Sequence, residues 1–215
     1  MCATILRSNA RVRRDADTGV CFVSDGIMPT IQKANRIIGN NLVLRNANAG
    51  DAEFILQLRT DPSKQRYLST TSPDLARQIA WLRDYENAPN QAYFVVEDKD
   101  ADKVGTIRLY DPVGDSFCWG SWILRAGVPA PYAVESVLML YHYAMENLGF
   151  RNSYFAVRKA NRSVWRFMEQ FGGVRTGVTE LDFLYEAKRE SVLQSFRRYS
   201  RILPDPIRVF HDPVS

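Results

Sequence analysis

The sequence predicts an α/β (α+β) fold in which one mixed sheet carries helices on both faces. Three observations lead to this prediction. A strand-like run at 116–124 passes through a short loop into a strongly periodic helix at 132–148. A second strand at 153–157 follows, and a second helix runs from Asn161 to the pair Gly172-Gly173. Short strands and helices also alternate along the rest of the chain, which favours a single sheet with covering helices.

The other elements follow from the same patterns of apolar and turn-forming residues. Continuous or alternating apolar runs predict strands, and apolar residues three and four apart predict helices. Before the central unit we expect strands at 42–45, 92–97 and 104–110, helices from Asn48 or Asp51 to residue 60 and from 72 to about 85, and turns at 98–102 and 111–115. After it we expect strands at 174–179 and 181–187 and a basic helix at 189–202, which Pro204 and Pro206 end.

Three parts of the chain differ in composition. Residues 1–40 are polar and rich in Arg and Asn without a sustained period, which predicts a poorly packed N-terminal extension. Residues 41–187 contain the predicted sheet and form one domain, and residues 188–215 form a C-terminal basic helix and tail. The two end segments each carry six Lys or Arg and three Asp or Glu. The domain between them is therefore slightly acidic although the net charge is +4.

Charge and composition narrow the classes of protein. Because the basic excess lies at the two ends and not on the predicted domain, we expect no nucleic-acid partner. No apolar run approaches the roughly 18–20 residues that span a bilayer, and no signal-peptide core is present. We therefore expect no membrane span and a cytoplasmic location. Cys2, Cys21 and Cys118 have no metal-ligand spacing, which predicts reduced thiols and no metal site.

The loop before the helix at 132–148 is the first candidate site. Unpaired N–H groups at a helix N-terminus, together with the helix dipole, favour a pyrophosphate, and Arg125 and Gly127 lie in this loop. Pro129 and Pro131 cannot donate N–H bonds. The site would therefore depend on the amides of Val128, Ala130, Tyr132 and Ala133. An ordinary strand-to-helix turn explains the loop equally well.

Asn161 is the second candidate. Asparagine is a preferred N-cap, and the helix that it would cap has an apolar face formed by Val164, Phe167, Met168 and Phe171. Capping alone accounts for an asparagine at this position. The alternative is that its side-chain amide bonds a ligand lying between the two helices.

Together, the order of elements and the segment 119–173 resemble the GNAT superfamily of N-acetyltransferases, which bind acetyl-coenzyme A (acetyl-CoA). The resemblance spans roughly residues 41–187 and implies a mostly antiparallel sheet. The family loop Arg/Gln-x-x-Gly-x-Gly/Ala is matched at Arg125 and Ala130, with Val128 at the first glycine and Gly127 one position early. The resemblance implies acetyl-CoA as cofactor, held by Trp122, Ile123, Leu124, Arg125, Gly127, Val128, Ala130, Tyr132, Asn161 and Val164.

The second helix resembles the family pattern Asn-x-x-Ala/Ser-x-x-Leu-Tyr-x-x-x-Gly-Phe from Asn161 onward. The tyrosine that members often use to protonate the leaving thiolate is Met168 here, so a general acid must come from elsewhere or from solvent. The phrases at 105–110, 117–124 and 157–161 resemble acetyltransferases of the ribosomal-protein N-terminal type. They also resemble relatives from surface-polysaccharide gene clusters, which are thought to acylate amino sugars.

An acceptor site is expected on the strands beside the cofactor loop. Strand alternation places Phe117, Trp119, Ser121 and Ile123 on one face and Cys118, Gly120, Trp122 and Leu124 on the other. Trp119 and Ser121 would suit a sugar, with Arg108 and Tyr110 as further substrate-binding residues; ordinary sheet packing is the alternative for the tryptophan. The candidate catalytic residues are Asp115, as a base, and Ser121, although aspartates are common in turns.

The sequence therefore predicts an N-acetyltransferase that transfers the acetyl group of acetyl-CoA to the amine of a small molecule by direct attack in a ternary complex. An amino sugar or nucleotide-linked amino sugar is the preferred acceptor. One alternative is acetylation of a protein N-terminal α-amine. Another is a non-catalytic acyl-CoA sensor, which Met168 and the proline-containing loop would suit. The basic arm and basic helix outside the shared core are expected either to cover the active site or to form a homodimer contact.

Overall fold

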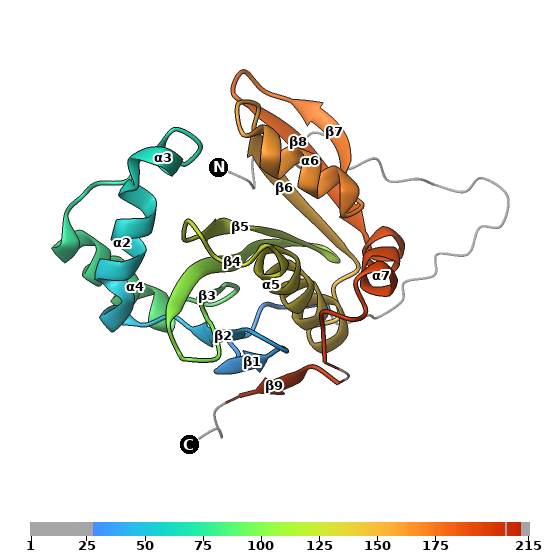
Figure 1. Cartoon of the computed structure of the whole chain (residues 1–215), viewed down its shortest axis with the longest axis horizontal. Helices are drawn as coiled ribbons and strands as arrows, with labels where there is room; N and C mark the ends of the chain where they lie inside the picture. Colours follow the sequence, from blue (N-terminus) through green and yellow to red (C-terminus); the bar gives the residue numbers. More distant parts are fainter. Residues whose placement is uncertain (1–27, 205, 212–215) are drawn as a thin grey trace, which may run out of the picture.

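One nine-stranded sheet organises the residues that the computed structural model describes, 28–204 and 206–211 (Figure 1). In sheet order the strands are β7 (Val174–Val178), β8 (Asp182–Lys188), β6 (Asn152–Arg158), β5 (Ser116–Leu124), β4 (Lys103–Val113), β3 (Ala92–Glu97), β2 (Val43–Asn46), β1 (Arg36–Ile38) and β9 (Arg208–Phe210). Neighbouring strands are antiparallel except β5 and β6, which are parallel. The predicted α/β (α+β) fold with a mixed, mostly antiparallel sheet is confirmed.

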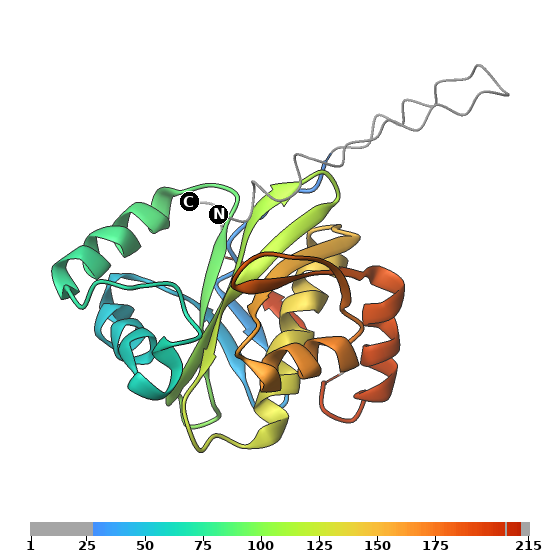
Figure 2. The same cartoon turned by 90° about the horizontal axis from the view of Figure 1, so that it is seen from above.

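Helices cover both faces of the sheet (Figure 2). One face carries η1 (Ala49–Asp51), α2 (Ala52–Thr60), α3 (Pro62–Gln65) and α4 (Leu75–Asn87). The other carries α5 (Ala130–His142), its π-helical continuation η2 (Tyr143–Asn147), α6 (Arg162–Gln170) and α7 (Arg189–Arg198). Helix α5 lies at the centre of its face, and seven consecutive residues of it, Glu135 to Tyr141, are therefore buried, not only its apolar stripe. None of the helices in the described ranges is long and apolar enough to cross a membrane.

Several boundaries differ from the expected ones. The helix expected at 132–148 starts at Ala130 and changes to a π-helical turn after His142. The turn expected at 111–115 is shorter, because β4 continues through Asp111 and bends there with φ at +47°. The last helix ends at Arg198. The short elements β1, α3 and β9 were not predicted.

The N-terminal extension requires a correction. Residues 1–27 lie outside the described residues, but 28–40 are not poorly packed. Ile31, Ala34 and Ile37 are buried, and β1 pairs with both β2 and β9. Both ends of the described chain therefore take part in one edge of the sheet. The division into three parts is otherwise not tested.

Strands β5 and β6 separate along their length, and this separation positions the candidate site. They pair only at 116–118 with 152–154. Beyond these pairs the strands diverge, as Figure 1 shows. Strand β5 remains paired with β4 up to Leu124, whereas beyond Cys118 its β6 edge has no partner strand among the described residues.

A β-bulge lies in the same part of β5. Arg108 pairs with Gly120 and Thr106 with Ile123, so two residues of β5 oppose one residue of β4. Ser121 is one of the two and has φ at +48°, in the left-handed region. The Thr106 hydroxyl donates to the Ser121 carbonyl at 2.7 Å.

The extra residue reverses the side-chain alternation of β5. Trp119 donates through Nε1 to the Tyr141 hydroxyl at 3.1 Å, and Trp122 donates through Nε1 to Ser136 Oγ at 3.2 Å. Both acceptors belong to α5. The expectation that Trp119 and Trp122 lie on opposite faces is therefore wrong.

Candidate active site

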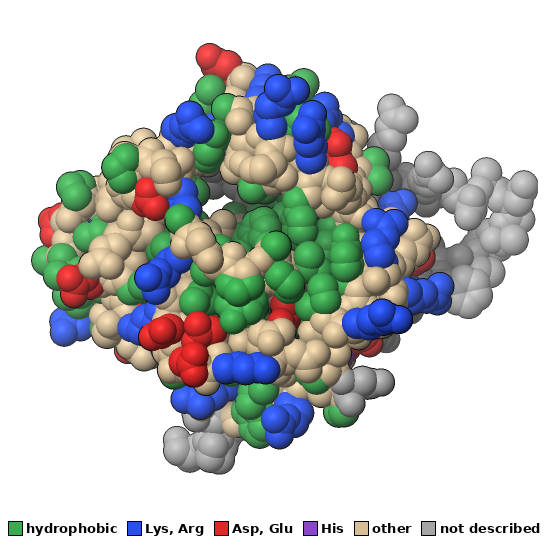
Figure 3. All heavy atoms as spheres, viewed as in Figure 1, with side chains coloured by type: hydrophobic (Ala, Val, Ile, Leu, Met, Phe, Trp, Pro, Cys, Tyr) green, Lys and Arg blue, Asp and Glu red, His purple; other side chains and the backbone are tan. Residues whose placement is uncertain are grey.

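A cavity of about 250 Å³, here called the central pocket, lies where β5 and β6 diverge. It is lined by the bulged part of β5, by β6 and α6, and by the end of α2 and the segment after α3; the members used below are Arg59, Tyr67, Tyr110, Ser121, Asn161 and Met168. Figure 3 shows the surface hollowed between the α2–α3 side and the α6 side, with hydrophobic side chains gathered beside the hollow.

A second cavity of about 430 Å³, the polar pocket, adjoins the central pocket. The two share Arg59, Ser69, Tyr110 and Ser121. The polar pocket continues over the hydroxyl-rich run 69–72 to the first turns of α4 and to Trp81. Cationic, hydroxyl and aromatic side chains therefore meet at one end of the central pocket.

A third cavity of about 260 Å³, the β5–α6 groove, adjoins the central pocket on its other side. The two share Tyr67, Leu68, Trp122, Asn161 and Val164. The groove continues along Ile123 and Leu124 to Ala133 in the first turn of α5. The three cavities form one path, with the central pocket between a polar end and a more apolar end.

Trp122 fixes the wall between the central pocket and the groove. Its ring stacks on Phe167 of α6 with centroids 5.4 Å apart, in addition to its bond to Ser136. The indole therefore bridges β5, α5 and α6. Such a side chain holds the width of the separation between the strands.

Asn161 lines both the central pocket and the groove, and it does not cap α6. Its φ and ψ are −86° and 69°, and its side chain accepts no backbone N–H of the helix. Its Oδ1 accepts a bond from the Ser163 hydroxyl at 3.2 Å. The capping interpretation is wrong, and the alternative that its amide faces a ligand site stays open.

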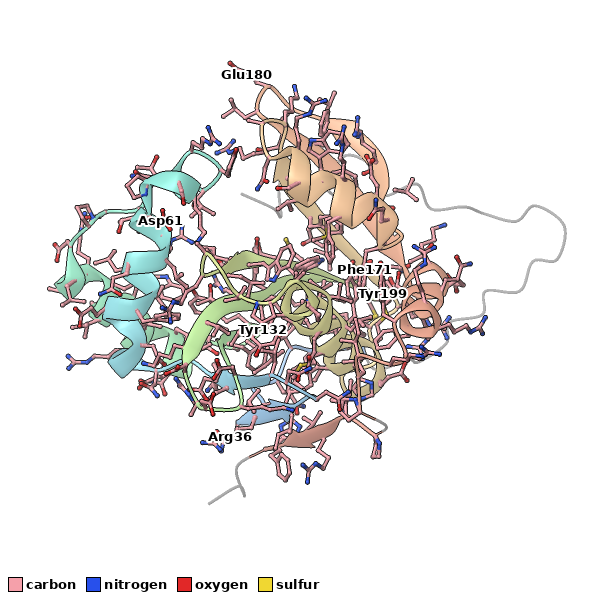
Figure 4. All side chains as sticks on the ribbon, viewed as in Figure 1. Arg36, Asp61, Tyr132, Phe171, Glu180 and Tyr199 are labelled. Carbon is pink, nitrogen blue, oxygen red and sulfur yellow. The ribbon has the colours of Figure 1, made fainter. Side chains whose placement is uncertain are left out.

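The loop from Arg125 to Pro131 joins Leu124 to the first turn of α5, and Leu124 and Ala133 on either side of it line the groove. Gly127 has φ at +81°, which the left-handed turn into α5 requires. Among the described residues, the amides of Gly127, Val128 and Ala130 find no acceptor. The Tyr132 amide was expected to bind the anion, but it donates to the Pro129 carbonyl at 3.0 Å and is therefore already engaged. Figure 4 places Tyr132 at the start of α5.

Arg108 lies in the polar pocket with a largely buried guanidinium. The guanidinium lies 5.0 Å from the Trp81 ring centroid and 4.8 Å from that of Tyr110, and it donates to Gln91 Oε1. Its Nε is buried without a hydrogen-bond partner. Burial lowers the pKa of Arg108 from its ordinary value. Arg108 therefore keeps one donor unsatisfied inside the protein while its side chain lines the polar pocket.

The structure does not bring Asp115 to this site. The residue lies in the turn before β5, at the end where β5 and β6 are paired. Its carboxylate accepts a hydrogen bond from the side-chain amide of Asn152 at 3.1 Å. Its backbone carbonyl accepts from the backbone N–H groups of Arg151 and Asn152. Asp115 therefore joins two strands and borders none of the three cavities. The prediction of Asp115 as the catalytic base is wrong, because its carboxylate lies away from the cavities.

The other predicted residues are distributed along the path. Trp119 borders the central pocket but is only 4% exposed, so sheet packing, its alternative interpretation, accounts for most of its surface. Ser121, Tyr110 and Arg108 lie at or near the junction with the polar pocket. Arg125 lies beside the loop, where its guanidinium donates to the Lys103 carbonyl at 3.4 Å.

Sequence reasoning missed the contribution of the α2–α4 region. Arg59 donates to the hydroxyls of Thr71 and Ser69 at 2.7 and 2.9 Å, which holds the hydroxyl-rich run against the polar pocket. Arg77 and Tyr67 also line the path. The sequence prediction used only Ser72 of this run, as part of a helix start. Four consecutive hydroxyl side chains at 69–72 were the available signal.

Comparison with known proteins identifies the family. Residues 41–174 match the family model described as the acetyltransferase (GNAT) domain, which is more than half of the chain. The chain belongs to the GNAT acetyltransferases, as its sequence predicted. Within the described residues, no group of three or more His, Cys, Asp or Glu side chains is placed to hold a metal ion. A search of curated proteins finds no match.

Solved structures support the same fold. FdhC, described as a nucleotide-linked sugar GNAT, superposes with a TM-score of 0.70 at 32% identity, covering 79% of this chain and 98% of that one. A GCN5-related N-acetyltransferase from Brucella melitensis has a TM-score of 0.67 at 20% identity, with coverage of 81% and 88%. Spermidine N-acetyltransferase from Vibrio cholerae has a TM-score of 0.62 at 19% identity, with coverage of 71% and 96%. The last two show likeness of fold only.

Proposed function

We propose that this enzyme transfers the acetyl group of acetyl-CoA to the amine of a nucleotide-linked amino sugar by direct attack in a ternary complex. The observation that carries the proposal is the polar pocket, which opens directly into the central pocket through Arg59, Ser69, Tyr110 and Ser121. The description of FdhC as a nucleotide-linked sugar GNAT, at 32% identity, supports the same class of acceptor.

The groove and the loop fit the acyl donor. Residues 122–124 leave the β6 edge of β5 without a partner strand, so backbone groups there can bond an extended pantetheine arm. The amides of Gly127, Val128 and Ala130, with Arg125 nearby, suit the pyrophosphate. When bound, the coenzyme supplies an activated acetyl thioester. In this arrangement the Asn161 amide lies beside the donor arm, at the border of groove and central pocket.

The polar pocket fits an anionic sugar nucleotide. Arg59, Arg77 and Arg108 contribute three cationic side chains, and Asp74 is the acidic side chain among the lining residues. The Asp74 carboxylate already accepts the Ala76 and Arg77 amides as the cap of α4. Guanidinium groups bind phosphate oxygens through paired hydrogen bonds, and Trp81 offers an apolar face to a sugar or base. A neutral or cationic acceptor would leave this charge uncompensated.

Positioning is the main contribution of the central pocket to the reaction. No carboxylate is found among its described lining residues, so no acidic side chain stands ready there as a base. An amine with a pKa near 8 is partly neutral at pH 7, which makes a strong base less necessary. Holding the amine and the thioester in one cavity supplies much of the rate. The Ser121 and Tyr110 hydroxyls border the place where the amine would enter.

The test is an acceptor panel with acetyl-CoA, in which release of free thiol is followed. The panel contains a nucleotide-linked amino sugar, the corresponding free amino sugar, spermidine and a peptide with a free α-amine. We expect the nucleotide-linked sugar to have the highest kcat/KM. Preference for spermidine would overturn the assignment of the polar pocket, and preference for the peptide would favour the N-terminal acetyltransferase alternative. Coenzyme binding without turnover of any amine would favour the sensor.

A further inference from the structure

We propose that Tyr67, in the segment after α3, is the general acid that protonates the departing sulfur. This inference rests on the proposed function. It starts from the border between the central pocket and the β5–α6 groove, which five described residues share: Tyr67, Leu68, Trp122, Asn161 and Val164. Among these five, only Tyr67 has a hydroxyl group, the kind of side-chain donor that can pass a proton to sulfur.

The bonding of Tyr67 agrees with this role. Its ring is half-buried, and within the described part of the chain its hydroxyl bonds to no other residue. Other tyrosine hydroxyls of the chain are engaged: Tyr141 bonds to Ser153 and Trp119, and Tyr185 bonds to Glu169. Because this hydroxyl has no partner among residues 28–204 and 206–211, it can bond a ligand atom at the border of the two cavities.

Two contacts hold Tyr67 in place. The Tyr67 amide donates to the Lys64 carbonyl at 2.8 Å, which fixes the backbone. The Arg66 guanidinium lies 4.6 Å from the ring centroid, so it packs on the face of the ring. On the opposite wall, Met168 lines the central pocket and cannot donate a proton. The acid would therefore reach the sulfur from the α3 side and not from α6.

The proton balance is complete. The amine nitrogen forms a bond to the acetyl carbon, and the carbon–sulfur bond breaks with its electron pair passing to sulfur. Tyr67 gives its hydroxyl proton to sulfur. The proton lost by the amine nitrogen passes to water, and the Tyr67 phenolate regains a proton from water. No further reactant is needed.

The first test measures binding and not turnover. The affinities of coenzyme A and of its desulfo analogue are compared by calorimetry in the parent and in Tyr67→Phe, which removes only a hydroxyl without a protein partner and should leave the fold intact. We expect the parent to prefer the thiol by about three- to tenfold, the value of one hydrogen bond, and Tyr67→Phe to lose this preference. Tyr199→Phe, at a half-buried tyrosine that packs on Phe171, and Arg83→Gln, on an exposed part of α4, should both keep it, since neither residue lines any of the three cavities.

The second test measures turnover with the best acceptor. General acid catalysis contributes about 10²-fold or more, and a thiolate leaves readily enough that the lower value applies. We therefore expect kcat of Tyr67→Phe to fall about 100-fold with KM for acetyl-CoA within about threefold. A retained thiol preference, or kcat within about twofold of the parent, would overturn the role of Tyr67. Failure of the parent to bind coenzyme A would instead overturn the proposed function.

Discussion

Arg108 offers a prediction in which stability and acceptor binding respond differently to one substitution. Its guanidinium is largely buried, has no carboxylate partner among the described residues, and leaves Nε without a hydrogen bond. Burial of an unpaired charge is costly. The contacts with Trp81, Tyr110 and Gln91 offset part of this cost. Arg108→Met keeps most of the apolar contact and removes both the charge and the unsatisfied donor.

The substitution is expected to leave stability nearly unchanged and to weaken binding of the acceptor. The cation–π contacts and the bond to Gln91 contribute about 1–4 kcal/mol together, and the desolvation that Met avoids is of similar size. We therefore expect the free energy of unfolding of Arg108→Met to stay within about 1 kcal/mol of the parent. A charge-assisted bond to phosphate contributes about 1.5–3 kcal/mol, which corresponds to a 10- to 150-fold increase in KM for a nucleotide-linked acceptor.

The assay combines urea unfolding with steady-state kinetics. Arg83→Gln is the matched control, because Arg83 lies on an exposed part of α4 and lines none of the cavities. KM for the acceptor should be unchanged in this control, and KM for acetyl-CoA unchanged in both variants. A loss of more than about 2 kcal/mol in stability, with acceptor KM unaltered, would refute the reasoning. Arg108 would then be a structural residue.

Three further predictions concern single residues. Asn161→Ala should raise KM for acetyl-CoA by about three- to tenfold without the roughly 1 kcal/mol loss that removal of a cap causes; a clear drop in unfolding midpoint would restore the capping interpretation. Ser121→Gly should be about 1 kcal/mol more stable than Ser121→Ala in urea, because φ at +48° suits glycine, and equal stabilities would mean that the bulge relaxes. Burial raises the pKa of Asp51, but bonds from Arg45 and Lys103 outweigh this and hold it at about 2 instead of 3.8. The ionised carboxylate therefore contributes about 2 kcal/mol of stability above pH 4, and this contribution is lost as the pH falls through about 2. In Asp51→Asn the free energy of unfolding should depend less on pH between about 4 and 2. An unchanged pH dependence would contradict the assignment.

The sequence predicted most of the sheet because its strands have apolar runs that are bounded by turn residues. Strand β3 and strand β5 have the expected bounds, and the loop before α5 lies where the pattern placed it. The bulge at Ser121 was not predictable from alternation, since an inserted residue has no mark in the apolar pattern. It nevertheless brings both Trp119 and Trp122 to α5 and decides which residues border the pockets.

The polar end of the candidate site was harder to predict for a different reason. Arg59 and the hydroxyl-rich run come from the segment around α2–α4, far along the chain from β5, and only tertiary packing brings them to Ser121. Asp115 shows the reverse error. It is close to β5 in sequence, but the strand extends for nine residues between that turn and the loop at its other end, so the carboxylate lies far from the pockets.

The pairing of β9 with β1 has a consequence for how the chain can fold during synthesis. The register joins Arg36 to Phe210, and the Asn40 side chain donates to the carbonyl of Ile202, 162 positions away. One edge of β1 must therefore wait for nearly the whole chain to leave the ribosome. Until then its N–H and C=O groups can pair with another nascent chain. Because such distant contacts form slowly, closure of this edge is expected to be the last step of folding.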